Sequence, residues 1–161
     1  MTCADVMTKD PSCCVPTDSA ARVAKIMKTE NVGSIPVCES RNNRKLIGIV
    51  TDRDLALRVV AEARDPTGTL VKDVMSREPL ACNPQDDLQK ALDAMQRRQV
   101  RRIPVVDERG MLTGIIAQAD IAIRVDQPEK TAKTVEQISR PSTARATETN
   151  VHKLVNPGPS T

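Results

Sequence analysis

The sequence predicts an α+β fold made of two copies of one β-α-β-β-α unit, and three observations lead to this prediction. The chain repeats itself in register, and each copy carries an amphipathic helical pattern. Each copy then carries two short apolar segments separated by a polar stretch, as expected for paired strands. At 161 residues the chain is long enough for one compact domain or for two small ones that share a core.

The repeat runs through most of the chain in a constant order. The two copies lie 68 residues apart up to the Ile-Pro-Val segment and 66 residues apart beyond it. The polar stretch between these parts is longer in the first copy, as hairpin loops allow. Two copies in register over about 55 residues are a duplicated unit. The matched segments are Asp5-Val6-Met7-Thr8 with Asp73-Val74-Met75-Ser76, Ile35-Pro36-Val37 with Ile103-Pro104-Val105, Gly48-Ile49-Val50 with Gly114-Ile115-Ile116, and Asp54-Leu55-Ala56 with Asp120-Ile121-Ala122.

Each copy has the same predicted elements. In the first copy these are a strand at Ser12–Val15, a helix from about Asp18 to Glu30, strands at Ser34–Cys38 and Leu46–Thr51, and a helix from Asp52 to about Ala63. Thr17 and Asp18 in the first copy, or Asn83 in the second, suit the start of the first helix. Strands this short bury only one face each, so we expect the two copies to pack together into one unit.

Composition limits the function classes. The chain has no Phe, Trp or Tyr, so its core must come from aliphatic residues, Met and Ala, which favours further burial in a dimer. A net charge of +3 does not call for nucleic acid or an anionic membrane as partner. The N-terminus lacks a basic, apolar leader pattern and no stretch approaches the roughly 20 apolar residues of a membrane span, so we expect a cytoplasmic protein.

The five cysteines and single histidine do not suggest a metal site. They show no C-x-x-C spacing, whereas structural zinc needs about four ligands in paired spacings. In a reducing compartment we expect free, packed thiols. No phosphate-binding glycine motif is present either, and the usual acid–base pairs reduce to carboxylates and lysines, so the sequence does not predict an enzyme.

The order Val-Met-[Thr/Ser], two prolines, amphipathic helix, Ile-Pro-Val, Gly-Ile-[Val/Ile] and an Asp that opens a helix resembles the CBS domain. Two copies in tandem resemble the Bateman module of that family. The resemblance implies two repeats about a pseudo-two-fold axis, with clefts between them, in a protein that often dimerises and regulates another. It places CBS domain 1 at residues 3–63, a linker at 64–72 and CBS domain 2 at 73–126. The prolines among Thr, Ser, Lys and Glu in residues 127–161 predict a polar tail that is partly disordered.

The resemblance also implies a ligand. Family members commonly bind AMP, ADP, ATP or S-adenosylmethionine, and their signature Gly-h-[Thr/Ser]-x-x-Asp (h, apolar) is met from Gly48 to Asp54. The second copy keeps Asp120 but has Ala117 in place of the hydroxyl. The residues that the resemblance assigns to the ligand are Thr51, Asp54 and Asp120, with Ile35 and Pro36 as adenine contacts and Arg101 as a phosphate contact.

Physical reasons support these roles and also offer simpler ones. Thr51 can donate its hydroxyl at a turn whose backbone N–H groups favour an anion, and Asp54 can accept ribose hydroxyls. The same two residues also suit a helix N-cap. The segment from Ile35 to Val37 suits a core strand, and Arg101 suits a solvated helix end.

A disulfide is a further implication of the resemblance. Some small CBS-pair proteins are similar at Cys14 and Cys38, which the fold would place on neighbouring strands, and have a bridge there. The alternative for these two residues is a pair of reduced, packed thiols.

Two main functional hypotheses follow. The first is a non-enzymatic regulatory module that needs no cofactor, binds an adenine nucleoside or nucleotide between the repeats, and signals to an unidentified protein partner. The second is a ligand-free interaction or structural homodimer with vestigial clefts, which Ala117 favours. A nucleic-acid binder is disfavoured, since single-strand binding usually needs aromatic stacking platforms.

Overall fold

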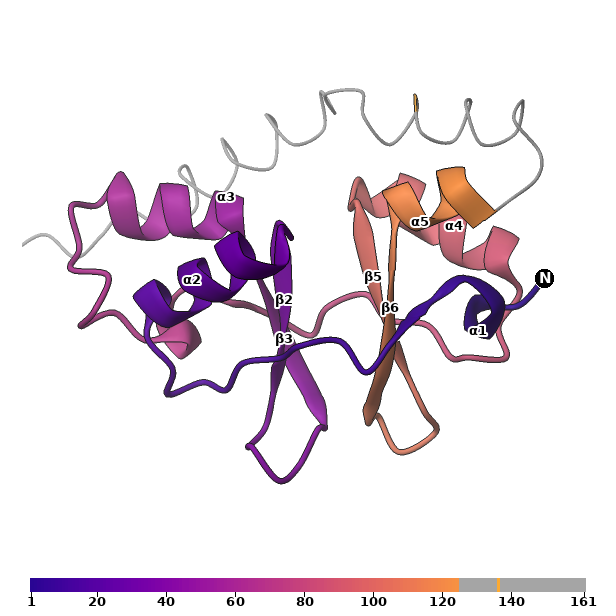
Figure 1. Ribbon diagram of the computed structural model, residues 1–161, viewed down its shortest axis with the longest axis horizontal. Coiled ribbons are helices and arrows are strands. Elements are labelled where there is room, and N and C mark those ends of the chain that lie inside the picture. Colours follow the sequence, from indigo (N-terminus) through magenta and orange to yellow (C-terminus); the bar gives the residue numbers. More distant parts are fainter. Residues whose placement is uncertain (125–135, 137–161) are drawn as a thin grey trace, which may run out of the picture.

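The computed structural model describes residues 1–124 and residue 136, and its two halves lie side by side (Figure 1). The polar tail predicted at 127–161 therefore lies outside the described residues, apart from residue 136. Each half consists of a small antiparallel sheet covered by helices, which confirms the α+β fold of two tandem repeats.

The central elements of each repeat follow the predicted order. In the first repeat they are α2 (Ala20–Glu30), β2 (Ser34–Cys38), β3 (Leu46–Thr51) and α3 (Asp52–Leu55), which continues as the π-helix η1 (Ala56–Val60). In the second repeat they are α4 (Leu88–Arg98), β5 (Arg102–Val106), β6 (Leu112–Ala117) and α5 (Gln118–Arg124). Both central strands of the first repeat have the predicted bounds.

The first helix of each repeat begins later than predicted. Ser19 caps α2 by accepting a hydrogen bond of 3.1 Å from the backbone N–H of Arg22, and Asp87 caps α4 by accepting one of 2.9 Å from Gln89. The predicted starts near Asp18 and Asn83 are therefore wrong. The side chain of Asp18 instead accepts a hydrogen bond from the backbone N–H of Val15, in the turn before the helix.

The strand predicted at Ser12–Val15 is reduced to a single bridge. Cys14 pairs in parallel with Val37, and the corresponding bridge in the second repeat joins Cys82 to Val105. One bridge places the chain beside the sheet without adding a full strand to it.

The segment that leads into each repeat pairs with the sheet of the other repeat. The N-terminal segment forms α1 (Cys3–Val6) and β1 (Thr8–Lys9), and β1 pairs with β6. The segment between the repeats forms the 3-10 helix η2 (Val71–Asp73) and β4 (Ser76–Arg77), and β4 pairs with β3. The sheet orders are therefore β2-β3-β4 and β1-β6-β5, and the repeats are interlocked rather than joined by a free linker.

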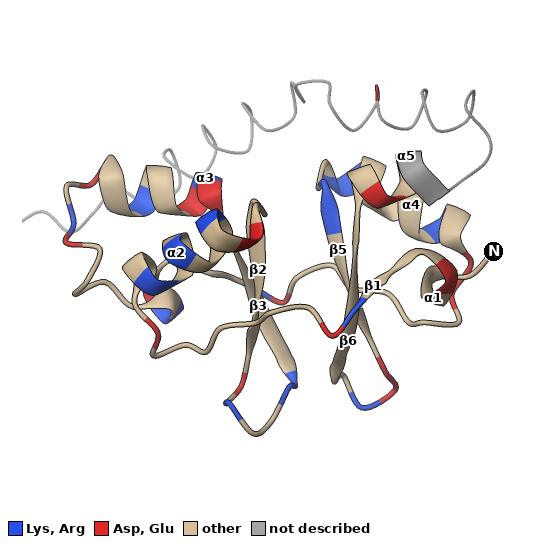
Figure 2. Ribbon diagram, viewed as in Figure 1, with Lys and Arg blue, Asp and Glu red and all other residues tan. Residues whose placement is uncertain are grey.

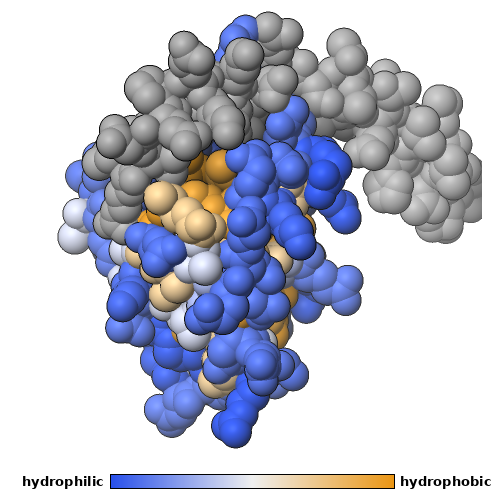
Figure 3. All heavy atoms as spheres, turned by 90° about the vertical axis from the view of Figure 1, so that its right-hand side faces the viewer, coloured by the Kyte–Doolittle hydropathy of each residue, from blue (hydrophilic) through white to orange (hydrophobic). Residues whose placement is uncertain are grey.

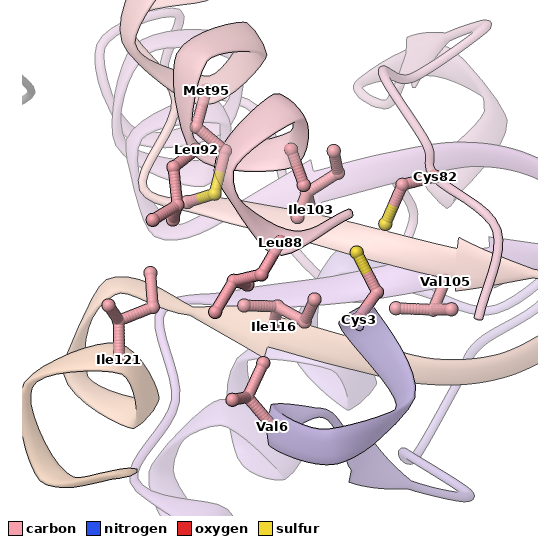
Figure 4. Packing of buried hydrophobic residues seen from close by; sticks show 11 residues of the cluster. Cys3, Val6, Cys82, Leu88, Leu92, Met95, Ile103, Val105, Ile116 and Ile121 are labelled. Atoms are coloured by element: carbon pink, nitrogen blue, oxygen red, sulfur yellow. The ribbon is translucent and has the colours of Figure 1, made fainter. Parts of the chain in front are cut away.

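The same exchange builds the two hydrophobic cores. The second-repeat core includes Cys3 and Val6 from α1, which pack against Val105 and Ile116 of the sheet (Figure 4). The first-repeat core includes Val71, Val74 and Met75 from the inter-repeat segment. Buried Leu88, Ala91, Leu92 and Met95 confirm the amphipathic α4. The second-repeat end of the molecule is mainly hydrophilic, with a smaller hydrophobic group among the polar atoms (Figure 3).

Glycine is required where a crossing segment passes over a sheet. A Cβ atom on Gly48 would lie 2.8 Å from the backbone oxygen of Ser76, and one on Gly114 would lie 2.5 Å from the sulfur of Met7. The glycines shared by the two copies of the repeat are therefore positions of close approach between segments.

The repeats also meet at their hairpin loops. The backbone N–H of Leu112 donates to the carbonyl oxygen of Arg44 at 2.8 Å, and the N–H of Leu46 donates to that of Gly110 at 3.0 Å. These bonds join the ends of β3 and β6, whose hairpins lie side by side in Figure 1. We call this set of contacts the inter-repeat seam.

Candidate functional site

The turn from β3 to α3 is a closed capping box. The backbone N–H and the hydroxyl of Thr51 both donate to Oδ2 of Asp54, at 2.9 and 3.0 Å, and the N–H of Asp54 donates back to Oγ1 of Thr51 at 3.1 Å. The structure thus brings together the two residues on which the ligand hypothesis depends, and it gives them the cap role as well.

The N–H groups of this turn are already occupied. The N–H of Asp52 donates to the carbonyl oxygen of Gly33 at 2.9 Å, and that of Arg53 donates to Oδ1 of Asp52 at 2.8 Å. The expectation that this turn offers free backbone donors and the Thr51 hydroxyl proton to a phosphate is therefore wrong for this conformation.

Asp54 retains an oxygen outside the cap. Its Oδ1 lies 4.0 Å from Nε of Arg58, one turn further along the helix, and the Asp54 side chain is 15% exposed. Arg58 in turn donates from Nη1 to the carbonyl oxygen of Val74 at 3.0 Å. The carboxylate can therefore accept a hydroxyl group from a ligand, and through Arg58 it is linked to the inter-repeat segment.

Ser34 is a candidate site residue that the sequence prediction missed. It is 6% exposed, and its hydroxyl has no hydrogen-bond partner within the described part of the chain. Ser34 pairs directly with Thr51 across β2 and β3, so the two side chains share one face of the sheet. The available signal was a small hydroxyl residue immediately before Ile-Pro-Val, at a position where the second copy has Arg102.

The two predicted adenine contacts lie on opposite faces of β2. Ile35 is 1% exposed and belongs to the first-repeat core, so its role in packing is clear. Pro36 alternates with it along the strand and therefore shares the face of Ser34 and Thr51.

The second repeat has different chemistry at the same place. Oδ2 of Asp120 accepts a hydrogen bond of 2.8 Å from the N–H of Ala117, but no hydroxyl completes the cap. Arg102 pairs with Ala117 in the ladder, as Ser34 pairs with Thr51. Arg101 is exposed and precedes the strand, so the basic residue directly across from this turn is Arg102. Figure 2 shows basic residues, in blue, at the start of β5.

The cysteines form two sulfur–sulfur contacts, and all five are free thiols. The thiol of Cys38 hydrogen-bonds to the side chain of Cys13, whereas the thiol of Cys14 donates to the carbonyl oxygen of Pro36 at 3.7 Å. The disulfide suggested for Cys14 and Cys38 is thus not formed here, because Cys14 faces the first-repeat core and the sulfur neighbour of Cys38 is Cys13.

The environments of these thiols shift their pKa values in opposite directions. The hydrogen bond from Cys38, aided by the charges of Arg44 and Arg41, lowers the pKa of Cys13 to about 6, although burial and Asp18 oppose the shift. The same hydrogen bond and burial raise the pKa of Cys38. Burial raises the pKa of Cys14 to about 12. Cys13 is therefore the thiol of this group that most readily ionises.

The described residues contain neither a cluster of metal ligands nor a membrane-spanning helix. No group of three or more His, Cys, Asp and Glu side chains is placed to hold a metal ion in residues 1–124 or 136. Within the same residues, no helix is both long and apolar enough to cross a membrane.

The interlocked repeats, their shared glycines and the capped strand-to-helix turns define a protein built from a pair of CBS domains. The chain belongs to the CBS domain family, whose sequence pattern matches residues 3–61 and 71–126. It is 38% identical over 135 residues to the CBS domain-containing protein YhcV of Bacillus subtilis, an alignment that covers 84% of this chain and 93% of that protein.

Solved structures share the fold. The crystal structure of Hypoxic Response Protein I with two coordinated zinc ions has a TM-score of 0.70 and 28% identity, over 78% of this chain and 99% of that one. The crystal structure of CBSX2 in complex with AMP has a TM-score of 0.63 and 25% identity, over 86% of this chain and 98% of that one. CBSX2, which shares this fold, thus binds AMP.

Proposed function

We propose that this protein is a non-enzymatic regulatory module that binds an adenine nucleoside or nucleotide, of the AMP, ADP, ATP or S-adenosylmethionine class, at the β3–α3 turn of the first repeat. The ligand would lie between the repeats, against the sheet face that carries Ser34, Pro36 and Thr51. No cofactor is required, and the expected partners are a second copy of the chain and an unidentified protein in the cytoplasm.

The observation that carries the proposal is the buried hydroxyl of Ser34. A buried hydroxyl without a partner costs about 1–3 kcal/mol, so such groups usually have a role beyond packing. Ser34 lies across the ladder from Thr51, on the face that also carries Pro36. A ligand oxygen or nitrogen at this place would satisfy the hydroxyl and recover that free energy.

Asp54 supplies the second polar contact. Its Oδ2 holds the cap, while Oδ1 keeps the lone pairs that a ribose hydroxyl needs. A hydrogen bond to a charged group is worth about 1.5–3 kcal/mol, enough to select a nucleoside over a free base. The AMP complex of the similar protein CBSX2 supports this ligand class.

The same carboxylate offers a route for a signal. A ligand hydroxyl at Oδ1 of Asp54 would compete with Arg58, which also donates to the carbonyl oxygens of Val74 and Met75 at 3.0 and 3.4 Å. These two residues belong to the inter-repeat segment and pack in the first-repeat core. Binding would thus shift the population of conformations in which this segment is held.

The second candidate function is a structural or interaction homodimer without a ligand. The closed capping box favours it, because Thr51 and Asp54 already satisfy one another. Ala117 favours it as well, since the second turn has no hydroxyl. Leu57 and Val60 on η1 are 50% and 77% exposed and would gain from burial against a second copy.

Calorimetry with AMP, ADP, ATP and S-adenosylmethionine tests the proposal on the native chain and on Ser34→Ala and Asp54→Asn. We expect at least one compound to bind, with an affinity about tenfold weaker in Asp54→Asn and several-fold weaker in Ser34→Ala, because each variant loses a hydrogen bond to the ligand. Ser34→Ala should leave the free protein at least as stable, since it removes an unsatisfied buried group.

The matched control is Asp120→Asn, which changes the equivalent carboxylate in the second repeat. This variant should bind the ligand with an affinity within about twofold of that of the native chain, a difference below 0.5 kcal/mol. Binding lost in this control but kept in Asp54→Asn would move the site to the second repeat. Absence of binding by all four compounds would refute the sensor and support the structural dimer.

A further inference from the structure

A cluster of two cysteines and an arginine lies at the inter-repeat seam, away from the β3–α3 turn. Nη1 of Arg44 lies 3.7 Å from Sγ of Cys13, and the thiol of Cys38 hydrogen-bonds to the same sulfur. Cys13 is partly exposed, whereas Cys38 is fully buried at the end of β2. The structure therefore places one accessible thiol between a cation and a second, sheltered thiol.

We propose that Cys13 is a thiolate that reacts with hydroperoxides and that Cys38 is its resolving thiol, so that the two close a disulfide. The proposal is independent of the adenine ligand, since none of these residues belongs to the β3–α3 turn.

The reactivity follows from the neighbours of Cys13. Only the thiolate is nucleophilic, and cations and hydrogen-bond donors stabilise it. Cys38 donates to Cys13, and the charges of Arg44 and Arg41 add to this effect, so that the lowered pKa of Cys13 leaves it ionised at neutral pH. The partial exposure of Cys13 gives a small oxidant access to the sulfur.

The chemistry balances with a hydroperoxide as oxidant. The Cys13 thiolate attacks one peroxide oxygen, the O–O bond breaks, and the other oxygen leaves as hydroxide or alkoxide, which takes up a proton. The product on Cys13 is a sulfenic acid. The sulfur of Cys38 then attacks Sγ of Cys13, an S–S bond forms, and the sulfenic oxygen leaves as water with the Cys38 proton. The two sulfurs lose two electrons in total, and the peroxide gains two.

Oxidation at this place would act on the seam. Arg44 holds the chain with Nη2, which donates to the carbonyl oxygen of Pro11 at 2.9 Å, and its own carbonyl oxygen accepts from Leu112 of the second repeat. A disulfide removes the anion beside Arg44 and ties Cys13 covalently to the end of β2. The contact that joins the two hairpins would therefore respond to peroxide.

The molecule contains a comparison pair. Cys3 and Cys82 also hydrogen-bond through their side chains, and their sulfurs face one another in the second-repeat core (Figure 4). The hydrogen bond from Cys82 lowers the pKa of Cys3 as well, but burial and the carboxylates of Asp86 and Asp87 oppose that shift. Both thiols are buried, at 0% and 7% exposed, so an oxidant has no access to them. A sulfur–sulfur contact is thus present twice, but only the Cys13–Cys38 contact combines a partly exposed thiol with nearby arginines.

The test is mass spectrometry of the reduced, full-length protein after treatment with a small excess of hydrogen peroxide at pH 7. We expect a loss of about 2 Da from disulfide formation, and a cross-linked peptide that joins the Cys13 and Cys38 segments. Cys14 shares a tryptic peptide with Cys13, so the variant Cys14→Ser identifies the sulfur and should form the same cross-link. Cys38→Ser should stop at a sulfenic acid on Cys13, which dimedone traps.

Two further variants measure how much the positive charge of Arg44 contributes to the reactivity of Cys13. Arg44→Gln should slow alkylation of Cys13 by iodoacetamide at pH 7 about three- to tenfold, because a smaller share of the thiol is ionised. Lys45→Gln removes a charge from the next residue, which is exposed, and should leave the rate unchanged. The proposal is wrong if Cys13→Ser still loses 2 Da at the native rate, if Cys3 and Cys82 cross-link first, or if peroxide leaves all five thiols intact.

Discussion

The two repeats share one architecture and differ in the chemistry at its edges. Both have an 11-residue first helix that ends at a residue in the left-handed conformation, Asn31 at φ 54° and Gln99 at φ 53°. Both have a five-residue and a six-residue strand, paired in the same register and with a bulge at the same place. The features that the two repeats share are thus those that packing determines: the lengths of the helices and strands and the register of the strands.

The differences at the strand-to-helix turns lie at side chains outside the two hydrophobic cores. Ser34 and Thr51 in the first repeat correspond to Arg102 and Ala117 in the second, although both repeats keep the aspartate that accepts from the turn. The sulfur contacts differ as well, since one is buried in the second-repeat core and the other is at the seam. Apolar patterning therefore preserves the fold in both copies, while the first repeat holds the groups suited to a ligand and to oxidation.

The largest expected effect tests whether the cores are equivalent. Ile35 and Ile103 occupy matched positions and are each 1% exposed, so Ile35→Ala and Ile103→Ala should each lower the free energy of unfolding by about 2–4 kcal/mol. Because each core includes a segment that leads into the other repeat, urea should still unfold either variant in one transition. Two separate transitions in either variant would show that the repeats are independent.

The glycine beneath the crossing segment should tolerate substitution less well in the first repeat than in the second. Gly48→Ala places a Cβ atom 2.8 Å from the backbone oxygen of Ser76, which cannot move without disturbing β4. Gly114→Ala meets first the flexible side chain of Met7, at 2.5 Å, and then a backbone oxygen at 3.1 Å. We expect a loss of about 1–3 kcal/mol for Gly48→Ala and a smaller loss for Gly114→Ala. Equal midpoints in thermal unfolding would contradict this difference.

The sequence predicted what depends on periodicity and missed what depends on contacts between distant segments. The short apolar segments on either side of a polar stretch identified the central strands, and the apolar face of Ala20, Val23 and Met27 identified the helix. The exchange of β1 and β4 between the sheets was not predicted, because two-residue strands carry no detectable period.

The candidate site was predicted in part for the same reason. Thr51 and Asp54 lie three residues apart on one turn, so local sequence indicated their contact correctly. Ser34 approaches them only through the strand register, and Ile35 faces the core because of that register. The sulfur partner of Cys38 likewise depends on which of two adjacent cysteines points away from the core, and sequence reasoning chose Cys14 where the structure has Cys13.

The strand-to-helix turns of the two repeats can also be compared, with smaller expected effects on stability. Thr51→Ala removes a cap hydrogen bond and should cost about 0.5–2 kcal/mol. Ala117→Ser introduces a hydroxyl next to the N–H groups of the second turn and should add up to about 1 kcal/mol of stability. Chemical denaturation at neutral pH measures both. If Ala117→Ser destabilises the protein as much as Thr51→Ala does, the second turn is not an incomplete copy of the first.

The last test of the comparison is the dependence of stability on pH that Cys13 contributes. The pKa of Cys13 is lowered to about 6 in the folded protein, against an ordinary value of 9.0, so the folded state holds the proton less tightly than the unfolded state. The contribution to stability is complete above the ordinary value and is lost as the pH falls through about 6. Between these limits, urea denaturation in a reducing buffer should show the free energy of unfolding of Cys13→Ser rising less steeply with pH than that of the native chain.

Cys14→Ser is the matched control. The pKa of Cys14 is raised, so its contribution to stability is lost only as the pH rises above the ordinary value, and this variant should keep the native slope below that pH. A native slope in Cys13→Ser would mean that Arg44 and Cys38 do not stabilise a thiolate at the seam.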